Sequence, residues 1–208
     1  KGQGLLKASP AKGGGYSWKW FKSELGENGN SLSSNNIYSM EQDADGRIWI
    51  GTYGGGISML PTPESENFVT VANNFPNYPQ EIGDRVRYLH CMPDGKMLAA
   101  TVGGLIWFEP SDTPELTRFH LVQKIPGDIR SLGNNDVIYM FTDRKDNTWL
   151  CTFGGGLNRL YFEDDIPRFD VYCSDNGLSS NIVHSAIDDD NGCIWIARES
   201  GISRLDPN

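Results

Sequence analysis

Residue types that could do chemistry occur in this sequence, but they do not recur together. The three histidines are scattered at His90, His120 and His184. No Ser/His/Asp order, paired-carboxylate motif or phosphate-binding loop accompanies them. His90 and His184 fall within runs suited to β-strands, so a general base at one of these two positions is the catalytic chemistry that the pattern leaves open.

Carboxylates gather in short acidic segments, of which residues 43–46 (DADG) and 188–192 (DDDNG) are the densest. Several oxygens so close together invite a calcium site. Both segments lack the longer ligand-bearing loop and the terminal bidentate Glu of a dedicated calcium cage. Asp and Gly are also the residues that tight hairpin turns require, so plain turns are favoured. No metal and no other cofactor is expected.

The cysteines and the net charge argue against a zinc or redox site and against binding to nucleic acid or anionic membranes. The four cysteines lack the short paired spacings of zinc or redox sites, so four unlinked thiols are expected. The chain has 18 Lys+Arg against 27 Asp+Glu and a formal charge of −9, without a basic cluster. Phosphate-rich partners are bound through such clusters, so nucleic acid and anionic bilayers are disfavoured as partners.

No apolar run is long enough to span a membrane. Because the sequence starts at Lys1, it either lost a leader or is a piece of something longer.

Self-similarity is the strongest signal in the chain. Residues 31–60 (SLSSNNIYSMEQDADGRIWIGTYGGGISML) and residues 131–160 (SLGNNDVIYMFTDRKDNTWLCTFGGGLNRL) align without a gap. A degenerate copy lies between them at 84–108, and a fourth copy runs from 177 to 205. The period is just under about fifty residues. The equivalent positions in the second strand of each copy are Trp49, Leu98, Trp149 and Trp195.

Each copy predicts a sheet of four antiparallel strands. In the first copy they are expected at 37–40, 47–52, 57–60 and 68–71, separated by the Asp-Gly and triple-glycine turns. The consecutive apolar residues Ile-Trp-Ile in the second strand indicate burial on both faces. The fold class is therefore all-β, with β-propeller blades of four antiparallel strands forming an arc of a larger propeller. A small ring, closed by residues 18–21 pairing with the last blade, is the alternative.

The expected boundaries follow the same register. They are the back half of a blade at 1–30, a blade at 31–80, a degenerate blade at 81–128, a blade at 129–176 and the front half of a blade at 177–208.

The stretch LSSNNIYSMEQDADGRIWIGTYGGGISML resembles the two-component regulator propeller repeat, and 177–205 looks like the same repeat with Arg198 and Glu199 in place of its Thr and the following residue. The resemblance implies a non-catalytic sensor segment from the periplasmic region of a hybrid histidine kinase, of the kind found in Bacteroides-like bacteria. Such sensors typically respond to oligosaccharides and regulate polysaccharide utilisation. The implied partners are a small-molecule saccharide, the rest of a sensor chain anchored in the inner membrane, and a second protomer in a homodimer. The sequence shows no kinase segment of its own.

The loop starts and the glycine turns are expected to share one face of the arc, where a ligand could bind. Aromatic rings and amides suit the apolar patches and hydroxyls of a sugar. The candidate ligand-binding residues are Tyr53, Phe153, Arg198, Glu199, Asn35, Asn135 and Asn181. Structural roles compete with each assignment: the asparagines as turn formers that cap their own backbone, and Tyr53 and Phe153 as packing on the glycine turns. Trp49, Trp149 and Trp195 are expected in the core.

Two other functions stay open. The first is a propeller lyase similar to the streptogramin lyases, which have comparable short repeats; it would use His90 or His184 as a base. The second is a scaffold that docks to protein and binds no small molecule.

Overall fold

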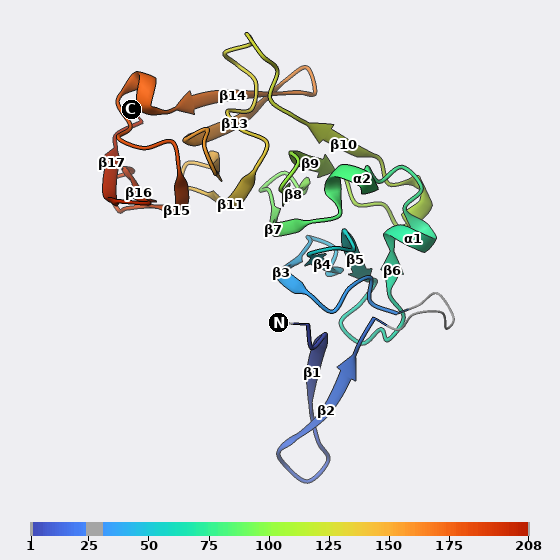
Figure 1. Cartoon of the computed structure of the whole chain (residues 1–208). Helices are drawn as coiled ribbons and strands as arrows, with labels where there is room; N and C mark the ends of the chain where they lie inside the picture. Colours follow the sequence, from blue (N-terminus) through green and yellow to red (C-terminus); the bar gives the residue numbers. More distant parts are fainter. Residues whose placement is uncertain (1, 24–30, 208) are drawn as a thin grey trace.

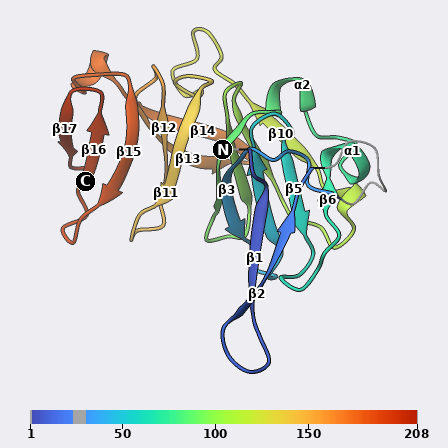
Figure 2. The same ribbon diagram turned by 60° about the horizontal axis from the view of Figure 1, so that its bottom comes forward.

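Five antiparallel sheets follow one another along the described part of the chain and form an arc (Figure 1). The computed structural model describes residues 2–23 and 31–207. The N-terminal hairpin pairs β1 (Leu5–Pro10) with β2 (Tyr16–Phe21). Residues 24–30 and 208, which belong to the first and last expected ranges, lie outside the described residues. Figure 1 shows the hairpin at one end of the arc and the last sheet at the other, and Figure 2 shows the hairpin extending beyond the other sheets.

Three complete blades form the middle of the arc. Blade 1 comprises β3 (Ile37–Gln42), β4 (Ile48–Thr52), β5 (Ile57–Leu60) and β6 (Val69–Thr70). Blade 2 comprises β7 (Val86–Cys91), β8 (Met97–Thr101), β9 (Leu105–Phe108) and β10 (Phe119–Val122). Blade 3 comprises β11 (Val137–Thr142), β12 (Thr148–Thr152), β13 (Leu157–Glu163) and β14 (Ile166–Tyr172). The predicted four-stranded antiparallel blades are confirmed.

The C-terminal sheet has three strands, β15 (Val183–Asp188), β16 (Ile194–Arg198) and β17 (Gly201–Leu205). Residues 18–21 pair with β1 and not with β17, so these residues do not close the arc into a ring. Short helical turns occupy the connections: α1 (Val71–Asn74) and α2 (Gln80–Gly83) before blade 2, and 3-10 turns at Pro114–Leu116 and Ser174–Asn176.

The core lies between neighbouring sheets. Every residue of β8 and β12 is buried, as expected for second strands covered on both faces. Separate apolar clusters fill the junctions of the hairpin with blade 1, blade 1 with blade 2, blade 2 with blade 3, and blade 3 with the C-terminal sheet. Each sheet therefore depends on its neighbours for burial, as in other repeat folds.

The expectation that all three repeat tryptophans are buried is wrong at one position. Trp49 and Trp149 are 1% and 0% exposed, whereas Trp195 is 41% exposed. The two buried indoles are covered by the following blade. No sheet in the described part of the chain covers the corresponding face of the C-terminal sheet, so Trp195 stays in contact with solvent.

The acidic turns hold these tryptophans in place. The indole Nε1–H donates to Oδ2 of the aspartate six residues earlier at 2.8 Å in three pairs, Trp49 with Asp43, Trp149 with Asp143 and Trp195 with Asp189. The other carboxylate oxygen accepts backbone N–H groups two and four residues later. In the degenerate second copy Met92 and Leu98 stand at the two positions, so donor and acceptor are replaced together. The carboxylate thus holds both the indole and the backbone of its own turn.

The described residues contain no group of three or more His, Cys, Asp or Glu side chains able to hold a metal ion. In the turn at 188–192, Arg144 of the neighbouring blade pairs with Asp188 and Asp190. The four cysteines are all free thiols in the structure.

Candidate functional site

One face of the arc carries the glycine turns and the loops that lead into the first strands, and we call it the glycine-turn face. Backbone bonds fix three residues at equivalent places on it. The N–H of Tyr53 donates to Asn36 O at 2.8 Å, and the N–H of Phe153 donates to Asp136 O at 2.9 Å. Val102 makes the same bond to Arg85 O at 3.3 Å. Tyr53, Val102 and Phe153 therefore form one row, one residue to a blade.

The two aromatic residues of this row are accessible. Phe153 is 49% exposed and forms an isolated bridge with Ile182 of the next sheet. Tyr53 forms the matching bridge with Arg85 and is stacked on Tyr38, with ring centroids 5.1 Å apart. Tyr38 is itself 41% exposed. A two-ring aromatic surface is thus available to a ligand at the junction of blades 1 and 2. Arg85, the bridge partner of Tyr53, has its Nε 3.4 Å from Asp84 Oδ1.

The three predicted asparagines share a different task. Each Oδ1 accepts a backbone N–H from the segment that follows the last strand of the preceding sheet, from Ser23 to Asn35 at 2.8 Å, from Lys124 to Asn135 at 2.7 Å, and from Ser174 to Asn181 at 2.7 Å. The bonded segment lies 7 to 12 residues earlier in the chain, so the expectation that these residues cap their own backbone is wrong. They hold the loop on which Tyr53 and Phe153 are displayed.

Main-chain bonds link the same loops to the glycine turns. The carbonyl of Asp84 accepts the N–H groups of Gly54, Gly55 and Gly56 at 2.9 to 3.0 Å. The carbonyl of Asn181 likewise accepts the N–H groups of Gly154 and Gly156. Gly55 cannot be replaced without movement, because a Cβ would lie 2.7 Å from Ser33 O. The glycine-turn face is therefore a rigid platform.

The structure does not bring all the predicted site residues together. Arg198 ends β16, and its guanidinium donates to Ile202 O at 3.2 Å on the adjacent strand. Glu199 is exposed at the turn that follows. Tyr53 and Phe153 are separated by the whole of blade 2. A ligand that touched Tyr53, Phe153 and the Arg198–Glu199 pair together would have to reach across four sheets, from blade 1 to the C-terminal sheet.

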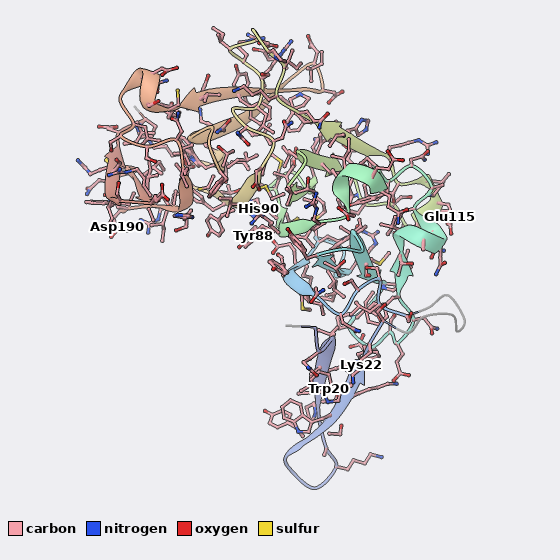
Figure 3. The ribbon with its side chains drawn as sticks, in the orientation of Figure 1. Trp20, Lys22, Tyr88, His90, Glu115 and Asp190 are labelled. Carbon is pink, nitrogen blue, oxygen red and sulfur yellow. The ribbon has the colours of Figure 1, made fainter. Side chains whose placement is uncertain are left out.

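Sequence reasoning missed the seam between the first strands of blades 2 and 3, which lies on the inner side of the arc. Arg87 and Asp136 form an ion pair there, with Nε and Oδ1 3.1 Å apart. Farther along the seam, Tyr88 packs on Tyr139 with ring centroids 4.8 Å apart. Figure 3 shows Tyr88 and His90 near each other on this inner side. A signal did exist, because Arg87, Tyr88 and His90 replace the Tyr, Ser and Glu of the first copy.

Burial decides the protonation chemistry of this seam. Desolvation lowers the pKa of His90, which favours the neutral imidazole at neutral pH. Its Nε2 lies 2.7 Å from Thr142 Oγ1 and is therefore engaged. Desolvation also raises the pKa of Asp136, although the nearby charges of Arg87 and Arg85 oppose this shift. The seam is thus a polar junction between blades 2 and 3.

The sequence and the fold of this chain are similar to those of several known proteins. Residues 31–54 match the family model described as the two component regulator propeller. The match falls within the first copy of the internal repeat, from Ser31 to Gly54. The curated relative Histidine kinase P4 of Formosa agariphila is 24% identical over 184 residues, which cover 86% of this chain and 13% of the relative. This chain thus spans a small part of the length of that kinase.

Solved structures show the same propeller fold. The extracellular domain of a putative hybrid two-component system from B. thetaiotaomicron is similar over 90% of this chain and 25% of its own, at 22% identity and a TM-score of 0.67. A streptogramin B lyase is similar over 87% of this chain and 55% of its own, at 13% identity and a TM-score of 0.58. At these identities the likeness concerns the fold. Among the helices of the described residues, none has the length and apolar character needed to cross a membrane.

Proposed function

We propose that this chain is a non-catalytic, ligand-sensing propeller segment of an extracytoplasmic two-component sensor. The repeat match and the similarity to a histidine kinase and to extracellular sensor domains support this assignment. The sensor works in the periplasm, anchored in the inner membrane through another part of the protein. Ligand shifts the arrangement of two protomers, and the signal regulates polysaccharide utilisation.

The proposed ligand is a neutral oligosaccharide bound on the glycine-turn face. The observation that carries this proposal is the accessible pair of stacked rings, Tyr38 and Tyr53, beside Arg85. Flat aromatic faces suit the C–H surface of a sugar ring, and guanidinium N–H groups suit its hydroxyls. Phe153 extends the surface toward the C-terminal sheet. Arg198 and Glu199 add polar contacts for a longer saccharide, while the three asparagines position the loops.

The test is calorimetric titration of the 208-residue chain with neutral di- to hexasaccharides, followed by variants. Tyr53→Ala and Phe153→Ala should each weaken the bound saccharide about fivefold, since one aromatic contact contributes about 1 kcal/mol. Tyr16→Ala is the matched control, because Tyr16 is 65% exposed on the N-terminal hairpin, away from this face. A folded chain that binds no saccharide, or equal affinity in all three variants, would contradict the proposal.

A lyase is the second candidate, because the fold resembles streptogramin B lyase and His90 lies on a first strand. The neutral imidazole suits a base, but its Nε2 is already engaged by Thr142. Incubation of the chain with quinupristin, the compound bound in the structure of a related inactive lyase, tests this candidate by mass spectrometry. Conversion that disappears in His90→Ala would establish it, and no conversion would exclude this substrate.

A further inference from the structure

A groove runs along the outer rim of the arc, between the last strand of blade 2 and the outer hairpin of blade 3. It has two lobes, of about 510 Å³ and 540 Å³. Trp107, His120 and Asp165 line both lobes, so the two meet at these residues. Lobes of this size match ordinary small-ligand sites. In Figure 1 the end of β10 and the β13–β14 hairpin lie side by side here, away from the inner side of the arc.

The groove contains a flat ring that is fixed in orientation. His120 lies on Trp107 with centroids 4.1 Å apart and an interplanar angle of 13°. Phe162 supports the indole from its edge, at 5.3 Å and 77°. Trp107 is only 8% exposed, whereas His120 is exposed, so the imidazole is the ring that a ligand meets. A rigid platform of this kind costs a ligand little ordering of the protein on binding.

The hairpin that closes the groove adopts a demanding backbone. Glu163 pairs with Ile166, which leaves a two-residue turn. Asp164 and Asp165 occupy it with φ of 50° and 61°, a region that non-glycine residues rarely adopt. Asn-Gly is the usual solution for such a turn. Here two aspartates adopt this unfavourable backbone conformation instead. Asp165 lines both lobes of the groove. Strained backbone positions cluster at ligand sites.

Side chains of both positive and negative charge line the groove. Arg168 Nη1 donates to Asp128 Oδ2 at 3.3 Å. Its Nε is buried and has no hydrogen-bond partner, since Glu163 Oε2 is 3.9 Å away. The charged residues of the two lobes balance, with Lys124, Arg118 and Arg168 against Asp128, Asp165 and Glu109. Balanced charge beside an aromatic platform disfavours phosphate-rich and lipid ligands and favours a neutral, hydroxyl-rich one.

We propose that this rim groove binds a neutral oligosaccharide, with His120 as the stacking platform and Asp165 and Arg168 as hydrogen-bonding partners. The ligand class rests on the proposed function, whereas the location is independent of the glycine-turn face. Two sites on one arc would let a single long saccharide, or two short ones, contact blades 2 and 3 from outside.

The test uses the same neutral di- to hexasaccharides with the full chain, read by calorimetry and by the tryptophan indole signals in NMR spectra. His120→Ala and Asp165→Asn should each weaken binding about fivefold or more. Asp165→Asn keeps the left-handed backbone, which Asn tolerates. Asp164→Asn is the matched control in the same turn, and His184→Ala controls for loss of an exposed histidine. Neither control should change the affinity, and both controls should fold like the wild type.

The outcomes separate this inference from the proposed function. Loss of affinity in Tyr53→Ala and Phe153→Ala, with none in the two rim variants, overturns the rim site and leaves the proposed function standing. The reverse pattern supports the rim site and overturns the glycine-turn face. No binding of any saccharide overturns both. If an array of extended peptides binds with loss in His120→Ala while saccharides do not, the groove is a peptide site and the saccharide assignment is wrong.

Discussion

Removal of the carboxylate of Asp143 should damage blade 3 far more than the same change at Asp189 damages the C-terminal sheet. Both residues accept an indole N–H at 2.8 Å, yet Trp149 is fully buried and Trp195 is 41% exposed. In Asp143→Ala the buried indole N–H loses its acceptor. In Asp189→Ala water can take the place of the carboxylate.

The magnitude follows from the bonds that Asp143 makes. An unsatisfied buried indole N–H costs about 2 kcal/mol. The N–H groups of Lys145 and Asn147, which lose the same carboxylate at 2.9 Å, lie nearer to solvent and add about 1 kcal/mol together. The local stability of blade 3 should therefore fall by about 3 kcal/mol. Asp189→Ala should be clearly milder.

The assay must resolve single blades, because repeat folds do not always unfold in one step. Native-state amide exchange, read by mass spectrometry over β11 and β12, gives the free energy of local opening. The matching peptides of β15 and β16 give the control. Equal losses in Asp143→Ala and Asp189→Ala would refute the argument from burial.

A double variant sharpens the test. The second copy carries Met92 and Leu98 where the others carry Asp and Trp. Trp149→Leu alone should cost about 3 kcal/mol, since it leaves a cavity beside a buried carboxylate. Asp143→Met combined with Trp149→Leu should cost about 1 to 2 kcal/mol less than the sum of the two single changes, because the two residues act as a pair. Additive losses would show that the pair is not a unit.

Three further predictions concern other parts of the chain. Burial acts to raise the pKa of Asp143, but hydrogen bonds from Trp149 and Asn147 outweigh it and hold the pKa below its usual value. This contribution to stability is present above the ordinary aspartate pKa of about 4 and is lost as the pH falls through the depressed value, so acid unfolding followed by circular dichroism should be shallower in Asp143→Asn. Asn181→Ala should loosen the turn that contains Ser174 by about 1 kcal/mol without unfolding the chain, as measured by amide exchange. Gly155→Ala should lower the melting temperature, because its Cβ would lie 2.3 Å from a backbone carbon of the preceding loop; an unchanged melting temperature would contradict this.

Much of the fold could be predicted from the sequence, because the same pattern of strands and turns recurs in each copy of the repeat. The Ile-Trp-Ile run predicts a second strand covered on both faces, and the structure buries Ile50 and Trp49 completely or nearly so. Trp195 shows the limit of this reasoning, because burial also depends on whether a neighbouring sheet is present. A pattern within one copy carries no information about that neighbour.

The site was harder to predict for a related reason. The side chains of Asn35, Asn135 and Asn181 bond to segments of the preceding sheet, and such partners are invisible to local turn propensity. The acidic turns also had a partner six residues away, and the joint change to Met92 and Leu98 in the degenerate copy was the signal that could have revealed it. The rim groove joins two blades through residues that obey no repeat, so periodicity could not find it.

The bonds from glycine turns to the carbonyls of Asp84 and Asn181 have an evolutionary consequence. Both partners are main-chain atoms, so the joint between neighbouring sheets survives almost any change of side chain at the accepting position, as the Asp at 84 and the Asn at 181 illustrate. Blade 2, which carries Met92 and Leu98 in place of the Asp and the Trp, still accepts these bonds from blade 1 through the carbonyl of Asp84. Because these main-chain hydrogen bonds do not depend on side-chain identity, the outward-facing residues of each copy are free to diverge toward new ligands.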